Sequence, residues 1–159
     1  MTHIASLSVL LFSPALLAQL APGDIGVTGF SSSDFGVISS GTTTGYSTPG
    51  YGGSGTSQAI LWDPSAPQSF LIGGFGFVGR ATVTGPGAVS YTNLTTAIGT
   101  ACQISFDFAG DVVIADAGVD QVRILNITTN TVTDLTTGAQ PWGTTVNAGA
   151  FNPTNGDII

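Results

Sequence analysis

The sequence predicts an all-β protein built from a repeat of about 44 residues. Of its 159 residues, 42% are hydrophobic and only 7% are charged, so the chain can bury a core and is neither a charge-solvated disordered segment nor a coiled coil. All nine acidic residues are Asp and both basic residues are Arg. The helix formers Glu and Lys are therefore absent, while Thr, Ser, Gly and Val are frequent.

The N-terminus is predicted to be a secretory signal. The segment 4–18 is a nearly continuous apolar run of 15 residues, which suits a signal peptide and is short for a membrane span of about 20 residues. A buried first strand or helix is the alternative. Cleavage after Ala18 would leave Leu16 three residues before the cut, and cleavage after Ala21 would leave Gln19 there. We place the leader at 1–21 and expect a secreted or cell-surface protein that is not inserted in a membrane after cleavage.

Two landmarks recur along the chain with one period. The first is an aromatic residue followed by Asp or Asn, at spacings of 44 and 45 residues. Its copies are Trp62-Asp63, Phe106-Asp107 and Phe151-Asn152. The second is a short aliphatic segment, which begins after Asp24, Ser69, Asp111 and Asp157. Gly-Asp precedes three of these four segments, which predicts a turn with a positive φ.

The unit that follows residue 102 shows the strand pattern most clearly. Short alternating or apolar segments predict strands at 103–108, 111–115, 121–126 and 131–135, separated by turns of small residues. Four short antiparallel strands per repeat of this length are typical of a β-propeller blade. A β-sandwich is the alternative, because turns every 8 to 12 residues fit it equally well. The recurring aromatic-Asx pair favours the propeller.

The units are predicted near 22–58, 59–102 and 103–147, with the start of a further unit at 148–159. In the first unit, the Gly-, Ser- and Thr-rich segment 39–57 is expected to be a long polar loop or a glycine-rich edge strand. About three blades are thus present in 22–159, and a closed propeller needs at least four. We therefore expect the N-terminal part of a longer propeller, whose unpaired edges make it unstable by itself.

Residues 103–126, QISFDFAGDVVIADAGVDQVRILN, resemble one repeat of the NHL-type β-propellers and align with it without a gap. The matching positions are Ile104, Asp107, Gly110, Val112, Ile114, Ala115, Asp116, Gly118 and Val122. Asp111 replaces the usual Asn, and Phe108, Val119 and Gln121 depart from the pattern. Relatives with similar blades include secreted binding propellers and streptogramin-lyase-like and gluconolactonase-like enzymes. The resemblance implies that such enzymes need Glu, or His and Glu, at their sites.

The aspartates are predicted to have structural roles. Asp107, Asp111, Asp116 and Asp120 fall within 14 residues and are the only calcium candidates, but their spacing matches neither an EF-hand nor a nonapeptide calcium repeat. We therefore predict no metal and no cofactor. An Asp at a strand end usually accepts hydrogen bonds from nearby backbone N–H groups. The predicted structural turn residues are Asp63, Asp107, Gly110, Asp116, Gly118 and Asn152.

Four side chains are candidates for facing a ligand. Arg80 and Arg123 are 43 residues apart, which predicts equivalent positions in two blades. Tyr46 and Tyr51 lie in the glycine-rich segment, where they would be exposed stacking groups for a carbohydrate. Packing or solvation is the plainer role for all four. Cys102, the single cysteine, is expected to be a small buried hydrophobic residue.

Composition limits the function further. The net charge of −7 leaves no cationic surface for phosphates, so nucleic-acid binding is not expected. The chain has no Glu, and its only His is His3 within the predicted leader, so 22–159 has no imidazole for general-base catalysis. We predict an extracellular binding or scaffold module whose partner is a protein or a glycan. The alternative is a lyase- or lactonase-type enzyme with catalytic residues beyond residue 159, so enzymatic activity stays open.

Overall fold

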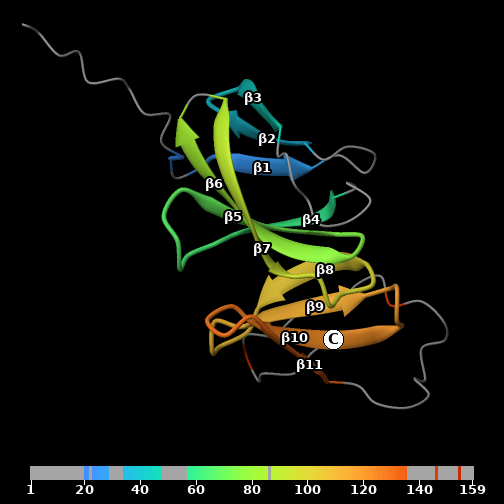
Figure 1. Ribbon diagram of the computed structural model, residues 1–159. Helices are drawn as coiled ribbons and strands as arrows, with labels where there is room; N and C mark the ends of the chain where they lie inside the picture. Colours follow the sequence, from blue (N-terminus) through green and yellow to red (C-terminus); the bar gives the residue numbers. More distant parts are fainter. Residues whose placement is uncertain are drawn as a thin grey trace, which may run out of the picture.

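The computed structural model describes residues 20–21, 23–28, 34–47, 57–85, 87–135, 146 and 154. Within these ranges the protein is all-β, as predicted, and forms three antiparallel sheets (Figure 1). Residues 1–19 of the predicted leader, Tyr51, Asn152 and most of the predicted unit 148–159 lie outside the described residues.

The first sheet contains β1 (Ile25–Thr28), β2 (Asp34–Ser39) and β3 (Thr42–Ser47). The second contains β4 (Ser57–Trp62), β5 (Ser69–Gly74), β6 (Phe77–Gly85) and β7 (Ala88–Thr95). The third contains β8 (Ala101–Phe106), β9 (Val112–Asp116), β10 (Gln121–Asn126) and β11 (Thr131–Asp134). Strands that follow one another in the chain are neighbours in every sheet.

The third sheet contains the four strands predicted for its repeat unit. The predicted strand 121–126 has the observed bounds of β10. The strand β8 lies two residues closer to the N-terminus than predicted, because the turn begins at Asp107, and it has a bulge between Ala101 and Gln103. The positive φ predicted for the Gly-Asp turns is confirmed at Gly23 (φ 95°) and Gly110 (φ 83°). Part of the segment 39–57 forms β3, an edge strand of the first sheet.

The sheets are stacked face to face, and two apolar cores fill the spaces between them (Figure 1). Side chains of β5 alternate between these cores, as successive residues of a strand point to opposite faces. Phe70 and Ile72 belong to the first core, and Leu71 belongs to the second. The first core is completed from the first sheet by Phe35, Val37 and Tyr46. The second is completed from the third sheet by Ile104, Val112, Ile114 and Leu125.

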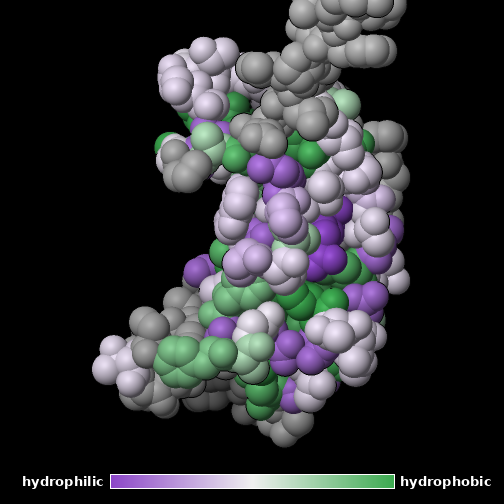
Figure 2. All heavy atoms as spheres, turned by 90° about the vertical axis from the view of Figure 1, so that its left-hand side faces the viewer, coloured by the Kyte–Doolittle hydropathy of each residue, from purple (hydrophilic) through white to green (hydrophobic). Residues whose placement is uncertain are grey.

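A third, smaller core lies on the other face of the third sheet, where Val113, Ala115 and Val122 pack with Val146. Each buried aliphatic or aromatic side chain contributes about 1.5 to 3 kcal/mol. The stack also leaves large apolar side chains on the surface, namely Ile25, Val27, Trp62, Phe108, Val119 and Leu135. Figure 2 shows hydrophobic residues between polar ones at the surface, most clearly in its lower part, where the third sheet lies.

The second and third sheets approach each other closely where β5 passes β8. A Cβ atom on Gly73 would lie 2.8 Å from the Cβ of Ala101, which is closer than two such atoms can pack. The small residues at both positions therefore set the distance between the two sheets.

Gly73→Ala should destabilise the protein by about 1 to 3 kcal/mol, because the added methyl group overpacks this contact. The measurement is the free energy of unfolding by urea in the full-length protein. Gly45→Ala is the matched control, since Gly45 lies in β3 with no atom within 4 Å of an added Cβ. Equal effects of the two substitutions would contradict the role of Gly73 as a spacer.

Candidate functional site

Asp63 closes the hairpin between β4 and β5. Its buried carboxylate accepts hydrogen bonds from the backbone N–H of Ser65 (2.9 Å) and the hydroxyl of Ser65 (2.6 Å). Arg80, on β6, donates its Nε to the other carboxylate oxygen at 2.6 Å. The carboxylate therefore holds the turn and ties it to the third strand of the sheet.

Asp107 closes the corresponding hairpin of the third sheet. Its Oδ1 accepts the N–H groups of Ala109 (2.8 Å) and Asp111 (2.9 Å). Its own N–H donates to the carbonyl of Asp111 at 2.9 Å, as the N–H of Asp63 donates to the carbonyl of Ser69 at 3.0 Å. The repeated aromatic-Asx pair therefore marks two equivalent hairpins.

Asp116 joins the turn after β9 to the connection between the second and third sheets. Its fully buried carboxylate accepts N–H groups from Gly99 (2.9 Å), Thr100 (2.6 Å) and Gly118 (3.1 Å). Arg123 on β10 completes the set with its NH1 at 3.1 Å. A Cβ on Gly118 would lie 2.6 Å from the backbone of Gly99, so the turn needs glycine there.

The two arginines are not at equivalent positions, and the sequence prediction is wrong by one residue. Arg80 lies opposite Leu71, two residues after Ser69, whereas Arg123 lies opposite Ile114, three residues after Asp111. The sequence spacing of 43 residues between the two arginines does not reveal this offset. The reason is that the loop from Asp63 to Ser69 is two residues longer than the loop from Asp107 to Asp111.

Both guanidinium groups bind carboxylates of the same chain. Arg80 pairs with Asp63, whereas Arg123 pairs with Asp116 and places its Nε 2.8 Å from a carboxylate oxygen of Asp134. Arg123 also donates to the carbonyl of Ala97 at 2.7 Å. Both arginines therefore have structural roles, because each connects segments of the same chain.

The four calcium candidates are divided between the two ends of one strand. Asp107 and Asp111 lie before β9, whereas Asp116 and Asp120 lie at and beyond its end. With a rise of about 3.3 Å per residue along a strand, the two pairs cannot share one ion. The residues described in the structure contain no group of three or more His, Cys, Asp or Glu side chains arranged to hold a metal.

Of the two roles open to Tyr46, packing is confirmed and exposure for stacking on a ligand is excluded. Its side chain is only 3% exposed and stacks on Phe35 with ring centroids 5.1 Å apart. Burial, with a smaller contribution from the negative charge of Asp24, raises the pKa of Tyr46 above its ordinary value. Gly45, next to it in β3, is exposed, so strand alternation turns the tyrosine inward.

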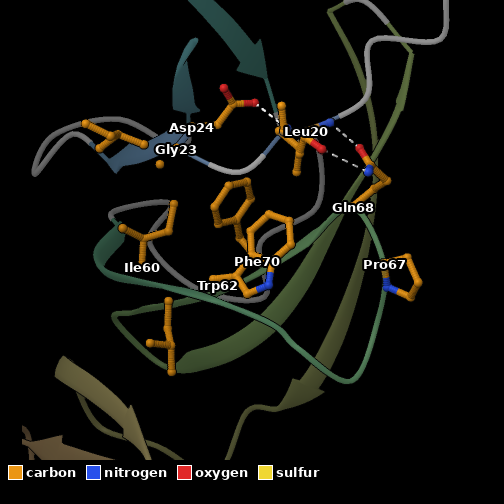
Figure 3. Close-up of a pocket in the computed structure, with 12 residues that line it drawn as sticks. Leu20, Gly23, Asp24, Ile60, Trp62, Pro67, Gln68 and Phe70 are labelled. Carbon is orange, nitrogen blue, oxygen red and sulfur yellow. Dashed lines mark hydrogen bonds between the residues drawn. The ribbon is translucent and has the colours of Figure 1, made fainter. Parts of the chain in front are cut away.

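A cavity of about 660 Å³ lies between β1 and the β4–β5 hairpin (Figure 3). Its lining residues are Leu20, Ala21, Gly23, Asp24, Ile25, Gly26, Ile60, Leu61, Trp62, Pro67, Gln68 and Phe70. Trp62 is 43% exposed and packs edge-to-face on Phe70, with ring centroids 5.4 Å apart. The sequence did not predict this cavity, and the one signal for it was the repeated aromatic position of Trp62.

The polar groups of the cavity bind its own backbone. The Gln68 amide contacts the N–H and the carbonyl of Leu20 (Figure 3). The Asp24 carboxylate accepts the N–H of Ala21 at 2.7 Å. Hydrogen bonds from the Ser39 side chain and, second, from Ala21 hold the pKa of Asp24 below its ordinary value, against a smaller opposing effect of burial. The surface that remains available to a ligand is therefore an apolar wall with one charged residue, Asp24, beside it.

β1 borders this cavity as an edge strand. Among the described residues it pairs with β2 alone, and its residues Ile25 and Gly26 line the cavity. An edge strand has unpaired backbone N–H and C=O groups that can pair with another strand. The cavity therefore combines an apolar, aromatic wall with an adjacent strand edge.

Comparison of the chain with models of protein families, with curated proteins and with solved structures finds no match. Among the described residues, no helix is long and apolar enough to cross a membrane.

Asp116→Ala should destabilise the full-length protein by about 2 to 5 kcal/mol, because it leaves Arg123 and three N–H groups without their buried acceptor. The measurement is thermal unfolding in calcium and in chelator, and the loss should be the same in both. Asp134→Ala is the control, because its carboxylate is 41% exposed and a surface pair is worth about 1 kcal/mol or less. A loss that appears only with calcium would reveal a metal role for Asp116.

Cys102 is only partly buried, not fully buried as predicted, and it should react slowly with iodoacetamide at neutral pH. Burial raises the pKa of its thiol, the charge of Asp116 adds to this, and a backbone hydrogen bond with Ala117 opposes it. The thiolate, which is the reactive form, is therefore less populated than in an ordinary cysteine. Alkylation followed by mass spectrometry should accelerate markedly in urea. Equal alkylation rates in buffer and in urea would contradict the protection of the Cys102 thiol by the fold.

Proposed function

We propose that the chain is part of an exported β-propeller, similar to the NHL type, that acts as an extracellular binding module. The stack of antiparallel sheets supports this proposal, because two of them contain four strands each in consecutive order. The first strands of these two sheets, β4 and β8, lie side by side (Figure 1). Blades of a propeller are arranged in the same way around its axis.

The first sheet fits this arrangement if β1 corresponds to β5. Gly26 then corresponds to Leu71, and a Cβ on Gly26 would contact Ile60 and Phe70 of the second sheet, just as Leu71 packs toward the third. Ile25 and Val27 face the other way and are 57% and 37% exposed. In a closed ring, this apolar face of the first sheet would be covered by another blade.

The proposed binding site is the cavity beside β1, and the proposed ligand is an extended apolar polypeptide segment. The observation that carries the proposal is the position of the β1 edge next to the wall formed by Trp62 and Phe70. Extended peptides bind strand edges through main-chain hydrogen bonds, and neighbouring pockets take alternate side chains. Partly exposed tryptophans are frequent centres of such interfaces.

The charge of the protein narrows the ligand further. The net charge of −7 and the carboxylate of Asp24 at the cavity disfavour acidic ligands. A neutral segment with one aromatic side chain suits the apolar wall. The chain contains such a segment at 146–152, VNAGAFN, which ends on the third copy of the aromatic-Asx pair.

A peptide of this sequence should bind the full-length protein and shift the fluorescence of Trp62 to shorter wavelength, because it removes the indole from water. Trp142→Phe is used as the background so that Trp62 is the reporter. A peptide in which Phe151 is replaced by Ala should bind about tenfold more weakly or worse, because one buried aromatic ring is lost.

The matched protein variants are Trp62→Ala and Phe108→Ala, both measured by calorimetry. Trp62 lines the cavity, whereas Phe108 is 69% exposed in the β8–β9 turn of the third sheet. We expect weaker binding for Trp62→Ala and unchanged binding for Phe108→Ala. Equal affinities for the two variants would exclude the cavity as the peptide site.

A further inference from the structure

Leu20 belongs to the folded core. Its side chain is only 9% exposed and packs in the first core, which also contains Phe35 and Phe70. A side chain buried this far normally contributes to stability as much as one from a strand interior. The folded domain therefore includes residues that precede Pro22, the first residue of the predicted mature chain.

The backbone on both sides of Leu20 is held by specific hydrogen bonds. The Gln68 amide accepts the N–H of Leu20 and donates to its carbonyl, the latter at 3.3 Å. Gln68 itself has a φ of 61°, and its carbonyl accepts the N–H of Val83 at 2.9 Å. Its unusual backbone conformation thus comes with an amide directed at Leu20 (Figure 3).

Ala21 connects this anchor to β1 through a turn. Its N–H donates to Asp24 at 2.7 Å, and its carbonyl accepts the N–H of Asp24 at 3.0 Å. Cleavage after Ala21 would remove every one of these contacts. It would also leave the Gln68 amide without its partner and place a charged terminus beside apolar walls.

From these contacts we propose that the leader is cleaved no later than Ala18, so that Leu20 and Ala21 remain in the mature protein. This inference rests on the export proposed above. Signal peptidases require small residues next to the cut, and the two alanines nearest to Leu20 on its N-terminal side are Ala18 and Ala15. Ala15 also has Ser13 three positions before the cut, and the preceding apolar segment 4–12 has a suitable length. The structure thus moves the expected boundary from residue 21 toward the N-terminus.

The test expresses the complete sequence, with its own leader, in an exporting host and identifies the N-terminus of the secreted protein by mass spectrometry. We expect the chain to begin at Leu16 or Gln19, the latter with or without cyclisation of the terminal glutamine. A chain that begins at Pro22 would overturn this inference and leave export intact. An uncut chain retained in the cell would overturn both proposals.

Hydrogen exchange in the same protein tests the anchor without reference to export. The amide of Leu20 should be protected, and Gln68→Ala should accelerate its exchange about tenfold or more. Gln103→Ala, in β8, is the matched control and should leave this exchange unchanged. A Leu20 amide that exchanges as fast as in an unstructured peptide would overturn the retention of Leu20 as part of the fold.

Discussion

The burial of β5 on both of its faces is the constraint on which the stack depends. Each residue of this strand is buried, and its side chains alternate between two different cores. A sheet with two apolar faces must be covered on both sides, because water would otherwise contact half of its large side chains. The second sheet therefore requires the first and the third. β9 is buried in the same way and places the same requirement on the third sheet.

The few charged side chains of the protein fix the positions of turns and strands that apolar packing alone would fix less firmly. Asp63 and Asp116 are fully buried, and each binds an arginine from the third strand of its own sheet. A buried carboxylate is costly unless several donors surround it, so each pair defines one geometry. Asp116 also holds the connection between two sheets, which links the turn chemistry of one to the packing of the other.

The cavity follows from the difference between the first sheet and the other two. β5 and β9 each have a neighbour on both sides within their sheet, whereas β1 has only β2 as a neighbour in the part of the chain that the structure describes. Trp62 and Phe70 line the same cavity as Ile25 and Gly26 of β1, and Leu20 lies beside them. The proposed binding, the proposed ring closure and the proposed processing of the N-terminus therefore concern one region of the molecule.

The sequence by itself determined the class of fold, the strands of the third sheet and the Asp-capped turns. These properties follow from local alternation and from side chains that bond to the nearest backbone groups, so neighbours in the sequence suffice to predict them. Only the tertiary structure decided that Tyr46 is buried and that Leu20 belongs to the core. It also decided that the positions of Arg80 and Arg123 in their sheets differ by one residue. These facts depend on loop length and on which sheet faces meet. The packing of segments that are far apart in the chain determines which sheet faces meet and how each loop is accommodated. A repeat period in the sequence does not predict this packing.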